Sequence, residues 1–207
     1  MTVAIVDYGV GNLGSVEKAA RQAGLAVVVT ADPAQVVAAD GVILPGVGAL
    51  RQGRERLMAL GLDTALAAVM AAERPLLGIC LGLQLFFGEG EEGGSGLGLL
   101  PGTVPRLSGV AKIPEIGWNL VEPVHESPLF RGLEQGGYFY FVHSYYVKPS
   151  EPSDVLATAE YGVRFAAAVQ RGNLFGVQFH PEKSGPLGLQ MLANFGEVVQ
   201  GAAKTSR

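Results

Sequence analysis

The amino-acid sequence predicts an α/β fold, in which a mostly parallel sheet has helices on both faces. Over the first 80 residues, short continuous apolar runs alternate with stretches whose apolar residues recur at helical spacing. Continuous apolar runs are typical of strands covered on both faces, and regular β-α alternation predicts parallel pairing. The 207 residues are 48% hydrophobic and 16% charged with a net charge of −4, which excludes a disordered chain. We expect one domain over residues 1–207.

Local patterns predict each element of the first half. Apolar runs indicate strands at residues 3–6, 26–30, 41–44 and 76–79, and helical spacing indicates helices at 13–23, 49–60, 62–72 and 83–87. Gly24 is suited to ending the first of these helices. Asp32 followed by Pro33 predicts an N-cap with proline at the first helical position, so a further helix starts there.

The second half is predicted to contain a glycine-rich stretch and several short strands. Seven of the fifteen residues from 88 to 102 are glycine, which fits either a flexible linker or, given the length inside a compact domain, a functional loop. Short strands are predicted after it at residues 116–124, 138–147, 166–170 and 174–179. Residues 186–199 predict a closing helix, and residues 201–207 are expected to be frayed.

Composition excludes several classes of protein. The single cysteine cannot form an internal disulfide, and a mildly acidic chain without a Lys/Arg cluster is a poor match to nucleic acid. The longest apolar stretch, residues 75–88, is shorter than the roughly 18 residues that a membrane span needs. No basic residue precedes Lys18, so a signal peptide is not expected. We therefore expect a cytoplasmic protein with neither a nucleic-acid nor a membrane partner.

A glycine-rich turn follows the first predicted strand. Residues 9–14 fit G-x-G-x-x-G, and Asp32 follows about twenty residues later, as in a dinucleotide-binding fingerprint. The same glycines are equally suited to a tight turn in any α/β fold. The motif alone leaves both interpretations open.

Cys80 lies between an apolar strand and a predicted helix, in the sequence Gly-Ile-Cys-Leu-Gly. This is the G-x-nucleophile-x-G pattern of a nucleophile elbow, in which the flanking glycines allow a sharp turn. The helix N-terminus favours the thiolate, and the backbone N–H of Leu81 is suited to an oxyanion hole. The alternative is a buried structural cysteine, which is common for a lone cysteine.

A nucleophilic thiolate needs a base, and the base needs an orienting partner. Of the three histidines, His180 closes an apolar strand and is followed two residues later by Glu182, which is placed to fix its tautomer. His125 lies in a polar turn and is expected at the surface, whereas His143 is either a structural histidine or a pocket wall. The sequence thus predicts a Cys-His-Glu triad.

The third predicted strand ends in Pro45-Gly46-Val47-Gly48. Its glycines would let a backbone amide turn toward the site as a second oxyanion donor. An ordinary glycine-rich turn is the alternative.

Together these segments resemble the class I glutamine amidotransferases, the Cys-His-Glu glutaminases. More specifically, six segments are similar to the glutaminase subunits of imidazole glycerol phosphate synthase, an enzyme of histidine biosynthesis: residues 8–15, 44–48, 78–84, 117–119, 140–145 and 178–184. The resemblance spans nearly the whole chain. It implies a flavodoxin-like sheet of the class I type, with additional short strands in the C-terminal half.

The resemblance also implies residue roles. Cys80 would attack the side-chain amide of glutamine, His180 would protonate the leaving ammonia and then activate water, and Glu182 would orient His180. The oxyanion hole would use Val47, Gly48 and Leu81, and substrate glutamine would be held by Gly48, Gln84, Glu92, Ser144 and Tyr145. No cofactor, metal or nucleotide is implied.

The partner implied by the resemblance is a (β/α)₈-barrel cyclase subunit that receives ammonia through a channel. Interface or gate positions match Asn12, Trp118, Tyr140 and Lys183, although Trp118 would also suit a core. Relatives are weakly active alone, and the Val47 peptide is the expected switch. Glu115 departs from the family pattern, in which a histidine is frequent at that position. The low charge of the chain fits a face covered by such a partner, and it fits an Ala- and Gly-rich composition equally well.

Three rival hypotheses remain at this point. Another class I glutaminase subunit, such as that for anthranilate or pyridoxal phosphate synthesis, would pair with a different acceptor subunit. A non-catalytic nucleotide-binding module would use residues 9–14. A Cys-His hydrolase of the related protease or chaperone type is disfavoured by the two-residue spacing of His180 and Glu182.

Overall fold

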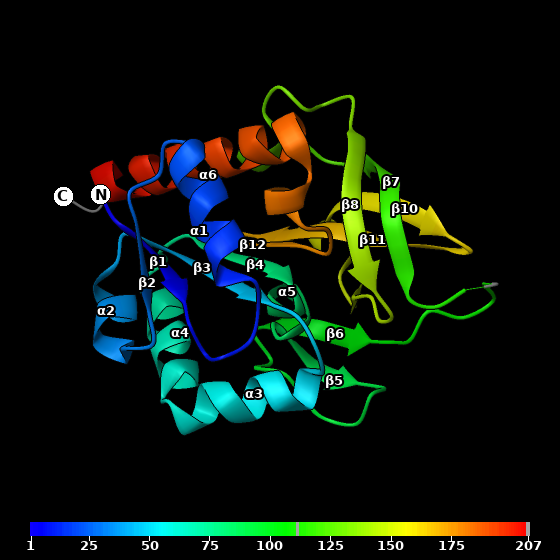
Figure 1. Cartoon of the computed structure of the whole chain (residues 1–207), viewed down its shortest axis with the longest axis horizontal. Coiled ribbons are helices and arrows are strands. Elements are labelled where there is room, and N and C mark those ends of the chain that lie inside the picture. Colours follow the sequence, from blue (N-terminus) through cyan, green and yellow to red (C-terminus); the bar gives the residue numbers. More distant parts are fainter. Residues whose placement is uncertain (111, 206–207) are drawn as a thin grey trace.

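A nine-stranded sheet forms the framework of the computed structural model, which describes residues 1–110 and 112–205 (Figure 1). Its strand order is β2-β1-β3-β4-β12-β11-β10-β7-β8, and a separate three-stranded sheet has the order β5-β6-β9. The strands are β1 Val3–Val6, β2 Val27–Thr30, β3 Gly41–Gly46, β4 Leu76–Cys80, β5 Phe87–Gly90, β6 Leu100–Val104, β7 Glu115–Pro123, β8 Gly137–His143, β9 Lys148–Pro149, β10 Val155–Tyr161, β11 Val163–Arg171 and β12 Leu174–Val177.

Six α-helices and three short 3₁₀ segments occur in the described part of the chain. They are α1 Leu13–Gln22, α2 Pro33–Ala38, α3 Leu50–Ala59, α4 Leu62–Ala71, α5 Leu81–Gln84, α6 Gly185–Thr205, η1 Pro128–Phe130, η2 Pro152–Asp154 and η3 Pro181–Lys183. The Asp32 side chain accepts a hydrogen bond from the Ala34 N–H, as predicted for the N-cap of α2. Among these described helices, none is long and apolar enough to cross a membrane.

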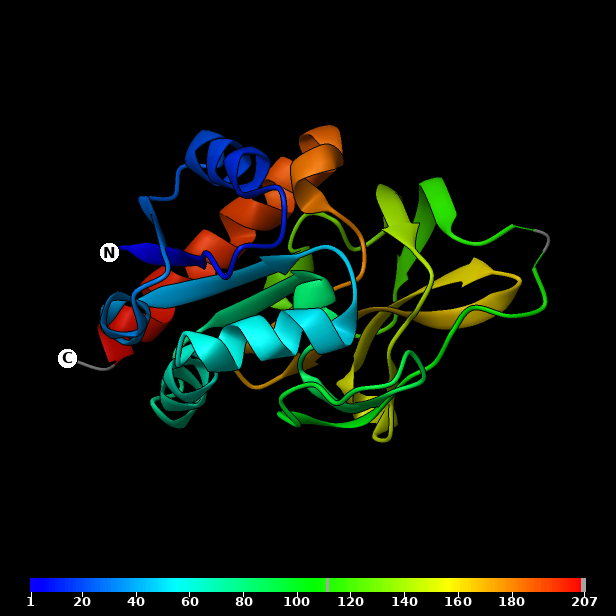
Figure 2. The same cartoon turned by 60° about the horizontal axis from the view of Figure 1, so that its bottom comes forward.

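The first five strands of the order, β2 to β12, pair in parallel and have helices on both faces. Alternate residues of β1 show the two layers: Val3 and Ile5 pack with α1 and α6, whereas Ala4 and Val6 pack with α2, α3 and α4. Figure 2 shows these two helical layers above and below the strands. The predicted α/β class is therefore confirmed, and the reason is that both faces of these strands are apolar.

The C-terminal half adds the antiparallel strands β11, β10, β7 and β8 to one edge of this sheet. The strand at Val155–Tyr161 was not predicted, because its residues alternate weakly in polarity. The glycine-rich stretch 88–102 is neither a linker nor a plain loop, since it carries β5 and β6 at its two ends.

Two helix predictions were wrong. The helix after Cys80 covers Leu81–Gln84 rather than 83–87, because Phe87 already begins β5. The closing helix continues to Thr205, so residues 201–205 are helical rather than frayed. Residues 206–207, which belong to the same prediction, lie outside the described part of the chain.

A buried hydrogen-bonded pair joins β7 to β8 at the start of their antiparallel register, where Glu115 lies opposite His143. His143 Nε2 is 2.8 Å from Glu115 Oε2, and its Nδ1 is 2.8 Å from the Tyr145 carbonyl oxygen. The other Glu115 oxygen accepts a hydrogen bond from the Asn119 side chain at 2.8 Å. Glu115 is thus buried inside the sheet, and His143 has the structural role that was one of its two alternatives.

Candidate active site

The turn from β4 into α5 presents Cys80. Its backbone has φ 55° and ψ −108°, a conformation that a residue with a side chain adopts only at a cost of roughly 1–3 kcal/mol. The turn also requires glycine on both sides. A Cβ atom on Gly82 would lie 1.8 Å from the Leu44 carbonyl oxygen, and one on Gly78 would lie 2.6 Å from the Phe86 ring. The sharp strand-to-helix turn predicted at Cys80 is therefore present.

His180 and Glu182 form a buried pair just beyond the end of β12. His180 Nδ1 is 2.7 Å from Glu182 Oε1, and the two side chains are only 3% and 2% exposed. The His180 backbone N–H donates to the Tyr140 carbonyl, and η3 begins at the next residue, so the main chain is fixed at His180. The other ring nitrogen, Nε2, is buried without a hydrogen-bond partner among the described residues, which leaves it for a reacting group.

Neighbouring charges decide the protonation of His180. Burial alone would lower the pKa of the imidazole, but its interactions with Cys80 and Glu182 outweigh burial and raise the pKa from 6.5 to about 9. The ring is therefore an imidazolium at neutral pH. Such a ring favours a thiolate at Cys80 and carries a proton that it can donate.

The end of β3 lies beside Cys80, since Gly46 is paired with Cys80 in the parallel register. The two residues that follow were predicted for the oxyanion hole: Val47 is 40% exposed and Gly48 has φ 104°, a conformation that favours glycine. Leu81, the third predicted oxyanion residue, is buried directly after Cys80. Val47 and Gly48 thus follow directly after the partner of Cys80 in the sheet, and Leu81 lies close to that partner, since a Cβ atom on Gly46 would be 3.0 Å from Leu81 Cβ.

Sequence reasoning missed Tyr8 as a part of this site. Its buried hydroxyl donates to the Pro45 carbonyl oxygen at 2.8 Å, which anchors the end of β3. Burial, and after it the charge of Cys80, raises the pKa of Tyr8 well above its usual range, so the phenol stays protonated. The only available signal was its place after the first strand, next to the glycine motif.

The predicted glutamine-binding residues lie in two groups. Gln84 Nε2 donates to the Tyr145 carbonyl oxygen at 3.0 Å, and Ser144 precedes Tyr145 in the same partly buried segment. Glu92 accepts a hydrogen bond from the Leu50 N–H at 2.9 Å, at the beginning of α3 and two residues after Gly48. Gln178, which was not predicted, donates from Nε2 to Cys80 Sγ at 3.6 Å. Its signal was a position two residues before His180.

Three of the four predicted interface residues form one cluster at the surface. Trp118 is 56% exposed, and its ring meets the Tyr140 ring edge-on with centroids 6.2 Å apart. Lys183 Nζ lies 5.5 Å from the centre of the Tyr140 ring. Asn12 is exposed at the start of α1, which packs against η3. The exposure of Trp118 excludes the core alternative for this residue.

Further apolar side chains extend this surface along β7 and β8. The exposed members on these two strands are Ile116, Leu120 and Tyr138. We call this set, together with Trp118, Tyr140 and Lys183, the aromatic face. Large exposed apolar areas of this kind mark interaction surfaces.

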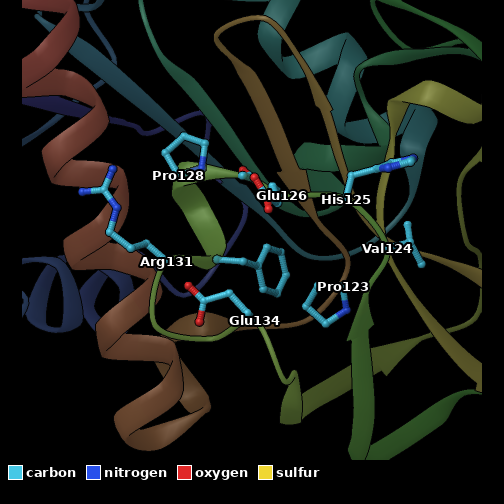
Figure 3. A pocket seen from close by; sticks show the side chains of 9 residues that line it. Pro123, Val124, His125, Glu126, Pro128, Arg131 and Glu134 are labelled. Carbon is cyan, nitrogen blue, oxygen red and sulfur yellow. The ribbon is translucent and has the colours of Figure 1, made fainter.

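A separate surface pocket of about 680 Å³ lies between the end of β7 and η1 (Figure 3). Its lining runs from Pro123 to Glu134 and includes the exposed His125 and Arg131. None of the predicted site residues lines it. Among the described residues, no group of three or more His, Cys, Asp or Glu side chains is arranged to hold a metal ion.

The sequence is similar to known amidotransferases over nearly its whole length. The family model "Glutamine amidotransferase class-I" matches residues 4–198. An imidazole glycerol phosphate synthase subunit HisH from Moorella thermoacetica is 55% identical over 97% of this chain and 96% of its own length. A HisH subunit from Symbiobacterium thermophilum is 53% identical over 95% of this chain and 94% of its own. The chain belongs to the HisH family of class I glutamine amidotransferases.

Solved structures support the fold of this HisH family member. A crystal structure of a glutamine amidotransferase has a TM-score of 0.73 at 19% identity and covers 95% of this chain and 98% of its own. PurLQS from Thermotoga maritima has a TM-score of 0.72 at 18% identity, with 97% of each chain covered. Identity to the HisH subunits is more than twice as high, which disfavours the rival hypothesis of a different class I glutaminase.

Residues 9–14, the glycine motif, form a turn that is hydrogen-bonded to other parts of the chain. The Gly9 carbonyl accepts a hydrogen bond from Arg56 at 2.8 Å, and the Asn12 side chain accepts one from the Ser15 N–H at 3.3 Å as the N-cap of α1. Gly9 and Gly11 both have positive φ. These observations favour the tight turn over the nucleotide site among the two interpretations of the motif.

The raised pKa of His180 predicts a titration that NMR can follow. We expect the His180 ring signals to titrate with a midpoint near pH 9, so the stabilisation from its protonation is complete below pH 6.5 and lost as pH rises through about 9. Glu182→Gln removes a negative charge and should lower the midpoint. The exposed His125 supplies a reference signal in the same spectra. A His180 midpoint at or below 6.5 contradicts the assignment.

Proposed function

We propose that this chain hydrolyses glutamine to glutamate and ammonia, and that a (β/α)₈-barrel cyclase subunit of imidazole glycerol phosphate synthase uses the ammonia in histidine biosynthesis. The cyclase makes imidazole glycerol phosphate and AICAR. The observation that carries the proposal is the 55% identity to a HisH subunit over nearly the full length. The buried His180–Glu182 pair next to the strained turn at Cys80 supplies the matching chemistry.

The reaction proceeds through a thioester. The Cys80 thiolate attacks the side-chain amide carbon of glutamine, and the carbonyl oxygen becomes an oxyanion. The His180 imidazolium then donates its Nε2 proton to the amide nitrogen, the carbon–nitrogen bond breaks, and ammonia leaves. Neutral His180 next takes a proton from water, whose oxygen attacks the thioester. Glutamate leaves, and the thiolate and imidazolium are restored, while Glu182 holds the ring through Nδ1.

Oxyanion stabilisation comes from the backbone at Val47, Gly48 and Leu81. The pairing of Gly46 with Cys80 in the parallel register supports this proposal, because the two residues after Gly46 begin next to Cys80. The Val47 peptide is the switch: its N–H supports the oxyanion in one orientation and not in the other. No metal or cofactor takes part in this scheme.

Substrate glutamine is held by two groups of residues. The first is Gln84, Ser144 and Tyr145, in which the Tyr145 carbonyl already accepts a hydrogen bond from Gln84. The second is Gly48 and Glu92, near the start of α3. The Glu92 carboxylate is a chemically suitable partner for the α-ammonium group of the substrate.

The partner docks on the aromatic face and on Asn12. Trp118 and Tyr140 are the aromatic anchors, and Lys183 follows Glu182 directly, so this surface adjoins the triad. A covered face of low charge keeps ammonia away from bulk water. We further propose that residues 1–207 act as a single amidotransferase domain, which the family match over residues 4–198 supports. We place this activity in the cytoplasm.

Replacing the nucleophile tests the reaction. In the purified complex with the cyclase subunit, Cys80→Ala should lose glutamine-dependent product formation by at least about 10³-fold, because no thioester forms. The same complex supplied with ammonium salt should keep its activity, since the cyclase is intact. Loss of both activities would count against ammonia delivery, and full glutamine-dependent activity would remove Cys80 from the mechanism.

Truncating the aromatic anchor tests the interface. Trp118→Ala should weaken association with the cyclase subunit about 30-fold in a calorimetric titration, as expected for a hot-spot aromatic residue. Met58→Ala is the matched control, because Met58 is 52% exposed on α3 and lies outside the aromatic face. Equal affinities for the two variants would place the interface elsewhere.

A further inference from the structure

Gln178 is a completely buried amide between β12 and His180. Its backbone N–H donates to the Ala167 carbonyl at 2.8 Å, which fixes the main chain. Its side chain has two partners: Nε2 donates to Cys80 Sγ at 3.6 Å, and Oε1 accepts from Gln84 Nε2 at 3.1 Å. Gln178 therefore contacts the Cys80 sulfur, which is the nucleophile of the proposed reaction, although no role was predicted for Gln178.

The direction of this hydrogen-bond chain is determined by one carbonyl. The Tyr145 carbonyl oxygen can only accept, so the amide group that faces it at 3.0 Å must be the nitrogen of Gln84. The same nitrogen faces Gln178 at 3.1 Å, which makes the facing atom of Gln178 its oxygen. The Gln178 nitrogen consequently points at Cys80, and it arrives as a donor.

A second buried group fixes the Tyr145 carbonyl, which sets the donor and acceptor directions of these hydrogen bonds. His143 Nδ1 also lies 2.8 Å from the Tyr145 oxygen, and the Glu115 carboxylate engages His143 Nε2. The carbonyl thus has two donors and cannot turn without losing both. The donor toward Cys80 is preorganised by groups that do not touch the sulfur themselves.

We propose that Gln178 is a further catalytic residue, whose side-chain N–H stabilises the Cys80 thiolate. The inference rests on the proposed function, in which Cys80 is the nucleophile. A buried thiolate needs donors besides the His180 imidazolium, and an N–H donor to a charged group is worth more than one to a neutral group. The sulfur loses its charge in the thioester and regains it when glutamate leaves, so the donor assists the departure of the thiolate in the second half of the reaction.

The alternative is that the Gln178 amide only fills space in the core. In that case, replacing it would not change the stability of the Cys80 thiolate. Gln178→Met removes the donor at similar volume. We expect the pH midpoint of Cys80 alkylation by iodoacetamide to move upward by about one unit, a tenfold change in thiolate stability. Glutamine-dependent kcat of the complex should fall about tenfold, while activity with ammonium salt stays unchanged.

Gln170→Met is the matched control. Gln170 lies on the adjacent strand β11, and its amide donates to the nearby Gly172 carbonyl rather than to the site. This variant should keep the wild-type alkylation midpoint and the wild-type kcat. The comparison separates loss of the donor from the general effect of a methionine in this sheet.

Gln178→Glu is the second variant, and it decides the matter where Gln178→Met does not fold. Its carboxyl is buried beside a thiolate and takes up a proton, so it can still donate a hydrogen bond to the sulfur, and its alkylation midpoint should stay closer to the wild-type value than that of Gln178→Met. An unchanged midpoint in Gln178→Met, or a midpoint in Gln178→Glu raised as far as that expected for Gln178→Met, overturns the role of Gln178. Alkylation does not need glutamine, so either result is distinct from failure of the proposed function, in which Cys80→Ala would leave glutamine-dependent activity intact.

Discussion

The backbone turn at Cys80 is the constraint on which the site depends. A positive φ at a residue with a side chain is costly, and it persists only where the surroundings determine it. Gly78 and Gly82 allow the close approach of strand, helix and Leu44 that the turn needs. Once Cys80 is placed there, the parallel register brings the ends of β3 and β12 to the same edge of the sheet, with Gly46 opposite Cys80 and Val177 opposite Ile79. The oxyanion segment and His180 follow from these strand ends.

Burial of polar side chains is the second constraint, and the fold places these side chains in hydrogen-bonded pairs. His180–Glu182 and His143–Glu115 are both almost inaccessible to solvent. Removing one partner leaves the other buried without its hydrogen bond, which generally costs about 1–3 kcal/mol. Against the effect of burial, Cys80 and, after it, Glu182 raise the pKa of His180. The second pair holds the Tyr145 carbonyl, which orders the amides of Gln84 and Gln178.

Local sequence patterns were sufficient for the parallel half of the fold. Continuous apolar runs located β1, β3 and β4, and Gly-Ile-Cys-Leu-Gly located the elbow, because each of these features depends on neighbouring residues. The contacts of Gln178 with Cys80 and Gln84 span 98 and 94 residues, so no local pattern indicates them. Glu115 was visible as a departure from the family, but its burial against His143 depends on the pairing of β7 with β8. The small sheet was missed for the same reason, whereas β10 was missed because its residues alternate weakly in polarity.

Trapping the acyl-enzyme tests the central claim that the turn at Cys80 delivers a nucleophile to the imidazolium. The complex with the cyclase subunit would be mixed with glutamine, quenched in acid within a single turnover, digested and examined by peptide mass spectrometry. We predict a glutamyl thioester on the peptide that contains Cys80, formed and then lost as glutamate appears. Turnover of glutamine with no adduct on that peptide at any time point would contradict the account.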